Sequence, residues 1–271
     1  MTTLQRIIKY LAIAFALFLA VSIVGGILGG VALLSNLTGS SGVAENMQSL
    51  SFSGEIRALE MEIGALEIKI QSGDTFSVET NSEDVSCEVS NGTLVIREQR
   101  HFLRLGKVGR LVVTVPEGFV FEEAELEFGA GAVDIDHLSA GKLDLNLGAG
   151  EVNIRSLTVT DKADIEGGAG EITIHGSSLA NLNLDMGVGQ LTLASRLTGS
   201  SEVHFGLGSA ELVLTGSLED YRIRLDKGLG SATIAGDKME NGVTYGTGSS
   251  FIDMEGGVGQ IRILFEQSST A

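Results

Sequence analysis

The sequence predicts an all-β protein whose main part is a single-stranded, right-handed parallel β-helix, and three observations lead to this fold class. First, a Gly-x-Gly phrase recurs eight times within residues 129–263, at intervals of 19, 20, 19, 19, 22, 18 and 11 residues. Second, apolar and polar residues alternate around each phrase, which is typical of a strand with one buried face. Third, a unit of about 20 residues cannot bury its own apolar face, so we expect the units to stack as a solenoid.

The glycines mark the expected corners of the coil. Glycine adopts positive φ readily and lets another backbone pass closely, so the chain can bend between two strands at each phrase. A degenerate copy, Gly246-Thr247-Gly248, precedes the last phrase. The other expected corner glycines are Gly129, Gly131, Gly148, Gly150, Gly168, Gly170, Gly187, Gly189, Gly206, Gly208, Gly228, Gly230, Gly257 and Gly259.

Stacked units would form continuous apolar columns inside a tube, with about 4.8 Å between neighbouring strands. Right-handed winding follows from the usual preference of crossover connections. An antiparallel sandwich or barrel is the alternative, because short strands with glycine turns also suit those folds. One expected column contains Leu126, Leu145, Ile165, Leu184, Val203 and Leu225, and the other contains Val133, Val152, Ile172, Leu191, Ala210 and Ala232.

Composition narrows the range of functions. The 271-residue chain has a formal net charge of −17, and its only two basic residues before Glu45 are Arg6 and Lys9. The remaining acidic part would repel nucleic acid, so we expect no nucleic-acid partner. The single cysteine, Cys87, excludes an internal disulfide.

The N-terminal segments indicate a single-pass membrane protein. Residues 11–34 carry no charge and, as a helix, would span roughly 36 Å, enough to cross a bilayer. Positive charge lies only before this segment, so residues 1–10 are expected in the cytoplasm and the chain after the membrane helix outside. A cleaved signal peptide is the alternative, with Gly42-Val43-Ala44 as a cleavage site. Gly25, Gly26, Gly29 and Gly30 would lie on one helix face and allow self-association.

The rest of the chain divides into four expected segments. Residues 35–53 are rich in Ser, Gly and Asn and read as a flexible tether. Residues 54–121 contain alternating strands, an Asn91-Gly92 hairpin turn and an irregular basic loop at 97–110, and they are expected to start and cap the solenoid. Residues 122–266 form the repeat solenoid, and residues 267–271 form a tail.

Several phrases resemble one bacterial family. They are the Gly-Ile-Leu-Gly-Gly end of the apolar segment, Leu111-Val-Val-Thr-Val-Pro-Glu-Gly-Phe119, the serial Gly-Ala-Gly and Gly-Val-Gly units, and Gly228-Leu-Gly-Ser-Ala-Thr-Ile234. Together they look like the putative adhesin family labelled domain of unknown function 4097. The resemblance covers about residues 7–266 and implies a membrane-anchored β-solenoid, sometimes associated with cell-envelope stress systems. It implies no catalytic or ligand-binding residues.

No motif for catalysis or cofactor binding stands out, and we expect neither an enzyme nor a cofactor. The Gly-x-Gly phrases lack the third glycine and the helix of a nucleotide-binding loop. Outward carboxylates Glu127, Glu166, Asp185 and Asp226 are candidates for a cation-binding strip, although a solvated face explains them more simply. The four histidines have no metal-ligand spacing, and Cys87 has no nearby histidine.

These observations predict a non-enzymatic surface-binding, adhesin-like module in the cell membrane, with an unidentified surface ligand. The alternative is an envelope-stress accessory or signalling protein that works through a membrane partner. A polysaccharide-processing enzyme is the third class, because β-helices also host glycan-cleaving carboxylate pairs. Carboxylate pairs arise here from the repeat itself, and the sequence has no Trp to stack on sugars.

Overall fold

The computed structural model describes residues 47–99 and 109–267. The chain divides into two compact units, residues 1–44 and 45–271, and the fold described below is that of the second unit. The predicted membrane helix at 11–34, with Gly25, Gly26, Gly29 and Gly30, lies outside the described residues. Within the described ranges, no helix is long and apolar enough to cross a membrane.

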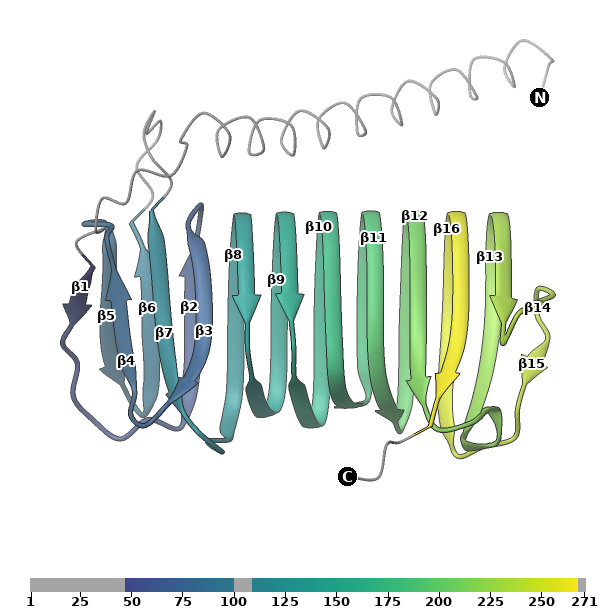
Figure 1. Cartoon of the computed structure of the whole chain (residues 1–271), viewed down its shortest axis with the longest axis horizontal. Helices are drawn as coiled ribbons and strands as arrows, with labels where there is room; N and C mark the ends of the chain where they lie inside the picture. Colours follow the sequence, from purple (N-terminus) through teal and green to yellow (C-terminus); the bar gives the residue numbers. More distant parts are fainter. Residues whose placement is uncertain (1–46, 100–108, 268–271) are drawn as a thin grey trace, which may run out of the picture. The chain divides into compact units, whose positions relative to one another are not determined.

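Five long strands form the middle of the domain, and each is one coil of the solenoid. They are β8 (Phe121–Ile135), β9 (Leu138–Ile154), β10 (Leu157–Ala180), β11 (Leu182–Thr198) and β12 (Ser200–Thr215). Each pairs in parallel with the next along its length, and Figure 1 shows the coils side by side as a row of arches. The all-β solenoid-like fold is therefore confirmed, and the antiparallel alternative is wrong for these units.

The expected apolar columns lie inside the coils. Leu126, Leu145, Ile165, Leu184 and Val203 are successive partners in the parallel ladder, and all five are fully buried. The second column, from Val133 to Ala210, follows the same ladder. Because every coil contributes to the same two columns, the buried side chains form one continuous core through the domain.

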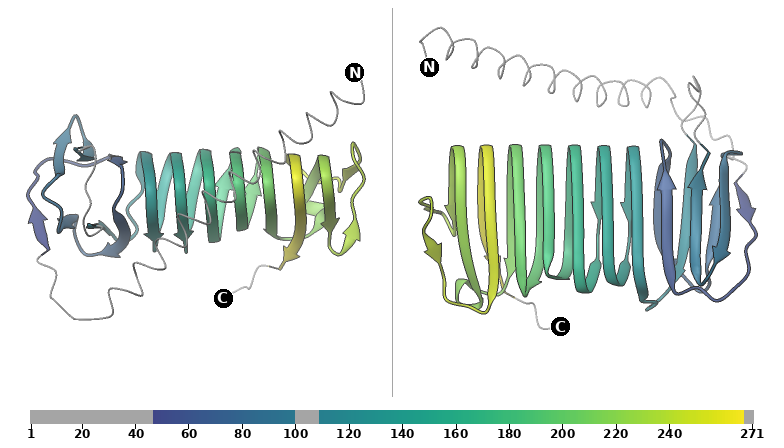
Figure 2. Two further views of the ribbon diagram at one scale, coloured as in Figure 1. Left: turned by 90° about the horizontal axis from the view of Figure 1, so that it is seen from above. Right: turned by 180° about the vertical axis from the view of Figure 1, so that it is seen from behind.

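The C-terminal coil does not lie where sequence order predicts. Strand β16 (Ser250–Glu266) inserts between β12 and β13 (Tyr221–Ile234) and pairs in parallel with both. Figure 1 shows it in yellow between two green strands, and Figure 2 shows the same order from behind. Met254 and Ile261 therefore separate the last members of the two columns, Leu225 and Ala232, from the rest. The expectation that each unit stacks directly on its predecessor is wrong at this end.

The degenerate phrase Gly246-Thr247-Gly248 is not a corner of a coil. It lies in the connection from β13 to β16, after the short strands β14 (Asp237–Lys238) and β15 (Thr244–Tyr245), which pair antiparallel with β13. Gly248 donates its N–H to the Tyr221 carbonyl at 2.9 Å. A 3-10 turn, η1 (Leu218–Asp220), leads into β13. This connection covers part of the outer edge of β13, so it serves as a cap.

The N-terminal end shows the same kind of insertion. Strands β2 (Ala58–Ile63) and β3 (Glu67–Gly73) make one coil, which pairs with β8 on one side. On its other side lie β6 (Thr93–Glu98) and β7 (Arg110–Pro116), again in parallel. The first coil in sequence is thus the second in space, and β8 stacks on it rather than on β7.

Antiparallel strands close the N-terminal end. Strand β5 (Val85–Ser90) forms a hairpin with β6, and its turn residues Asn91 and Gly92 have φ values of 53° and 85°, as the Asn-Gly prediction required. Strands β4 (Ser77–Thr80) and β1 (Gln48–Leu50) extend the sheet beyond β7. The predicted flexible tether at 35–53 is therefore too long, because Leu50 packs against the core. The predicted basic loop is also too long at its ends, since Arg97 and Arg110 belong to strands.

Candidate functional site

The corner glycines bring neighbouring backbones closer together than any side chain would permit. Gly131, Gly150, Gly170, Gly189, Gly208, Gly230 and Gly259 have φ values from 133° to 150°. A Cβ atom on Gly189 would lie 1.8 Å from the carbonyl oxygen of Gly170, and one on Gly187 would lie 2.5 Å from that of Gly168. Both glycine positions of each phrase must therefore remain without side chains, which leaves a bare strip of backbone along the tips of the arches.

A groove of about 960 Å³ runs beside this strip across seven consecutive coils, from β8 to β13. Each coil contributes three residues: an outward residue before the corner, the next residue, and the first glycine. We call the outward residues the rim row. In stacking order, the rim row consists of Glu127, Asn146, Glu166, Asp185, His204, Glu255 and Asp226.

The floor of the groove consists mainly of glycine backbone. At three of the coils the residue before the first glycine, Phe128, Met186 or Phe205, lies beneath the groove with its side chain almost wholly buried in the core. The side chain of Leu147 is half-buried. At Gly167 and Gly256 the corresponding side chain is missing, and Ile172 and Ile261 fill the space beneath. The groove therefore has a floor formed mainly by glycine backbone, with the apolar core beneath it, beside a rim of mainly acidic groups.

The rim row brings all four predicted cation-strip candidates into one register, but not into a metal site. No group of three His, Cys, Asp or Glu side chains in the described part of the chain is placed to hold a metal ion. Asp185 bonds to His204, with 2.9 Å between Oδ1 and Nδ1. Within the described ranges, Glu166, Glu255 and Asp226 take part in no hydrogen bond or ion pair, so their charges face solvent alone.

A second acidic row lies two residues earlier on the same strands. Its members, in stacking order, are Glu60, Glu125, Asp144, Asp164, Asn183, Glu202, Asp253 and Arg224. Partial loss of hydration raises the pKa of Glu125, and the negative charges of Glu60 and Asp144 above and below it raise this pKa further. Some members have cationic partners, such as Asp164 with Lys162 at 2.7 Å and Asp253 with Arg224 at 2.8 Å.

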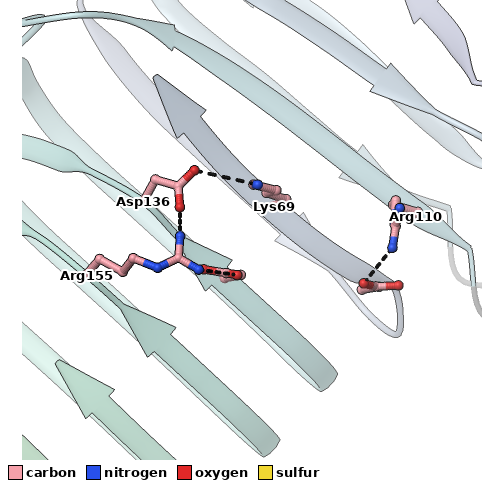
Figure 3. Close-up of polar contacts among 6 residues, drawn as sticks. Lys69, Arg110, Asp136 and Arg155 are labelled. Atoms are coloured by element: carbon pink, nitrogen blue, oxygen red, sulfur yellow. Dashed lines mark hydrogen bonds and ion pairs between the residues drawn. The ribbon is translucent and has the colours of Figure 1, made fainter. Parts of the chain in front are cut away.

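The strands after the corner carry balanced charge instead. Figure 3 shows Lys69 and Arg155 both directed at Asp136, with 3.7 Å between Lys69 Nζ and Asp136 Oδ2. Arg110 pairs with Glu67 at 2.9 Å in the same view. Farther along this side, Arg262 pairs with Glu211 at 2.7 Å. The excess of negative charge is thus concentrated on the groove side of the corner, not spread evenly around the coil.

The remaining candidate residues form no reactive site in the described part of the chain. His137 shares hydrogen bonds of 3.1 Å with Ser139 and with Ser156, so its ring nitrogens are occupied locally. Cys87 lies half-buried in β5, and burial together with the charge of Glu88 raises the pKa of its thiol to about 11. This thiol is protonated at neutral pH and is a poor nucleophile.

The sequence did not reveal that Glu255 and Glu62 lie in line with the rim row. Glu255 belongs to the rim row only because β16 inserts into the stack, and Glu62 extends the row because β2 pairs with β8. A signal for the insertion was present in the spacing of 11 residues before the last Gly-x-Gly phrase. That spacing is too short for a full coil, so the preceding Gly246-Thr247-Gly248 phrase had to be a connection.

The fold and groove define an all-β, solenoid-like domain with a continuous groove along its arch tips. The chain belongs to the DUF4097 family, described as Toastrack, whose sequence profile matches residues 74–251, more than half of the chain. This confirms the family resemblance noted in the sequence. No curated protein matches the chain.

Several solved structures are similar to this chain at low identity. A putative cell adhesion protein from Clostridium sporogenes is 16% identical over 82% of this chain and 99% of its own, with a TM-score of 0.34. A putative adhesin from Bacteroides fragilis is 11% identical over 80% and 96%, with a TM-score of 0.33. A putative lipid binding protein from Parabacteroides distasonis is 12% identical over 81% and 96%, with a TM-score of 0.35. All three TM-scores are below 0.5.

Proposed function

We propose that this protein is a non-enzymatic binding module of the bacterial cell envelope, which presents its solenoid outside the cytoplasmic membrane and binds an elongated partner through the groove. The observation that carries the proposal is the groove itself, which crosses seven coils with the same three positions lining it in each. A repeated surface suits recognition of an extended partner, because many weak contacts add along its length. Enzymes instead depend on one unique arrangement of reactive groups.

Membrane anchoring is part of the proposal and rests on the sequence. The uncharged segment 11–34 and the basic residues before it support a single membrane helix with a cytoplasmic N-terminus. A right-handed winding of the solenoid follows from the same crossover preference that applies to other parallel strands.

A second candidate function is that of an accessory or signalling protein in the envelope stress response. The spacing of Gly25, Gly26, Gly29 and Gly30 favours it, because small residues on one helix face allow close approach of another membrane helix. In this case the membrane helix, not the groove, would make the contact that matters.

A comparison of the full-length chain with residues 45–271 tests the proposal. We expect the shorter protein, once circular dichroism and cooperative unfolding show that it is folded, to bind isolated cell envelopes or intact cells as the full-length chain does. Loss of binding and of any cellular effect on removal of residues 1–44 would favour the membrane-partner function instead. Release of sugar fragments from cell-wall polysaccharide by the folded domain would overturn the non-enzymatic assignment.

A further inference from the structure

We propose that the partner in the groove is an extended basic peptide segment, lying along the stack with its Lys or Arg side chains directed at the rim row. This inference rests on the proposed function and specifies the partner of the same groove. Its basis is the charge and shape of the groove.

The length of the groove suits a short peptide. Seven coils at about 4.8 Å per step extend over roughly 29 Å, which corresponds to about nine residues of extended chain at about 3.3 Å each. An extended peptide places alternate side chains on the same side, at intervals of roughly 6.6 Å. The rim-row residues follow one another at about 4.8 Å instead, and the long, flexible side chains of Lys or Arg can make up this difference in spacing.

Side chains of the protein must hold the partner, because the backbone of the arches is already engaged. The coils from β8 to β13 pair in parallel with one another up to and beyond the corners, as Gly150 does with Gly131 and Gly170. Their N–H and C=O groups therefore point along the stack at neighbouring coils and not into the groove. Addition of a peptide as a further strand is excluded at this position.

The polar and apolar parts of the groove match the two parts of a Lys or Arg side chain. The aliphatic stem of such a side chain can lie on the glycine backbone of the floor, while its charged end reaches the rim. Glu166, Glu255 and Asp226 are the available acceptors, since each lacks a partner within the described ranges. Lys227 is the cation that lines the groove, at the last coil, and its Nζ donates to the Gly230 carbonyl at 3.3 Å.

Negative charge is more concentrated on the groove side of the corner than on the rest of the coil surface. The rim row and the second acidic row lie side by side before the corner, whereas on the other side cations such as Lys69, Arg155 and Arg262 pair with several of the acids. A basic partner would therefore be drawn to the groove side in particular, and its association would weaken with ionic strength.

The test measures fluorescence anisotropy of a labelled peptide of about nine residues, with alternating lysine and threonine, against the full-length chain in a mild non-ionic detergent. We expect saturable binding that weakens as salt is added, and no binding of the same peptide with glutamate in place of lysine. In the Glu166→Gln, Asp226→Asn and Glu255→Gln triple variant, affinity should fall by at least about tenfold, or roughly 1.4 kcal/mol.

The matched control removes the same charge elsewhere. Glu117→Gln, Glu151→Gln and Glu171→Gln change exposed carboxylates that do not line the groove, and this triple variant should bind within about threefold of the parent, less than 0.7 kcal/mol. Neutralising the groove residues relieves like-charge repulsion, so unfolding does not explain a loss of binding. Equal losses in both variants, or binding of the glutamate peptide, would overturn the inference. So would binding of spermine with no binding of the peptide, which would make the site one for small polyamines.

Failure of this inference can be distinguished from failure of the proposed function. If the folded domain still binds cell envelopes and the groove variant binds them equally well, the binding function stands and the groove assignment is wrong. If the domain binds neither envelopes nor the peptide, both are wrong.

Discussion

At the scale of single residues, the packing of glycine against glycine decides how closely the coils can approach. The second glycine of each phrase combines a positive φ with a neighbouring carbonyl oxygen that lies where a Cβ atom would be. Gly at these positions loses chain entropy on folding, yet no other residue satisfies both conditions. The recurring phrase in the sequence is therefore a direct consequence of the stacking distance.

A substitution at one corner should accordingly be far more harmful than one at an ordinary turn. We expect Gly189→Ala to lower the free energy of unfolding by at least about 3 kcal/mol, because its Cβ would lie 1.8 Å from the Gly170 oxygen. Gly118→Ala is the control, since Gly118 has a φ of 73° and open space around it, and should cost about 1 kcal/mol. Urea denaturation measures both, and equal losses would show that the corners tolerate side chains.

Ser201 offers the opposite case of a residue that weakens the core. It lies in an inward column beside Ile252 and is 1% exposed. Its hydroxyl has no hydrogen-bond partner within the described residues. Replacement by alanine removes an unsatisfied buried group, so Ser201→Ala should raise the free energy of unfolding by about 1 kcal/mol.

Thr80→Val provides the comparison of opposite sign. Thr80 is equally buried, but its hydroxyl donates to the Arg110 carbonyl at 2.8 Å. The same hydroxyl oxygen accepts from the Ser82 N–H at 3.0 Å. Loss of both bonds should lower the free energy of unfolding by about 1 to 2 kcal/mol. Thermal melting of both variants distinguishes the cases, and a decrease for Ser201→Ala would mean that its hydroxyl is satisfied in solution.

At the scale of strands, the notable feature is that the coils at both ends are out of sequence order. Strand β16 has partners on both of its edges, and so does the coil of β2 and β3. A strand with two partners cannot fray from the end of the stack as a terminal coil would. The order also leaves short capping strands, not long bare ones, at the outermost edges.

Truncation before β16 tests this consequence. Ending the chain at Gly248 would remove the strand between β12 and β13 and leave facing edges on both, with Val203 and Leu225 exposed at the break. We expect loss of cooperative unfolding and aggregation of this variant, whereas removal of residues 268–271 should leave the melting temperature unchanged. A cooperative transition close to that of the parent after the larger truncation would show that β16 is only a peripheral strand.

At the scale of the whole domain, electrostatic repulsion along the two acidic rows opposes folding at neutral pH. The folded-state pKa of Glu125 is raised, so the folded protein binds more protons than the unfolded chain in the pH range between that raised value and about 4.3. Stability should therefore increase as pH falls from 7 through this range. Hydrogen bonds from Ser217 lower the pKa of Asp220, and its contribution is lost only at pH values below about 3.9.

Urea denaturation at a series of pH values from 7 downward tests whether stability increases on acidification. We expect the urea midpoint to rise on mild acidification, and the rise should be smaller in Glu125→Gln, which is also more stable at pH 7 than the parent. A midpoint that falls steadily from pH 7 would contradict the repulsion. The parent protein should regain its lower midpoint on return to pH 7, since the change is only one of protonation.

Salt gives an independent measure of the same repulsion and tests the predicted cation strip. Sodium chloride should raise the melting temperature by screening the acidic rows. Magnesium or calcium chloride at equal ionic strength should raise it no further, because three carboxylates do not converge anywhere in the described part of the chain. An additional increase with either divalent cation, together with heat of binding in calorimetry, would establish a site in the rim row.

The repeat by itself determined the solenoid-like stacking, the corner glycines and the register of most of the rim row, because a period of about 20 residues returns each position to the same place in the next coil. Tertiary structure alone decided the order of the terminal coils, since pairing of β16 with β12 joins residues that are 51 apart in sequence, as in Arg262 with Glu211. Local periodicity carries no information about such a choice. The order of the terminal coils depends on which arrangement gives a strand hydrogen-bonded partners on both edges. For this reason the positions of Glu255 and Glu62 in line with the rim row could be seen only in the folded domain.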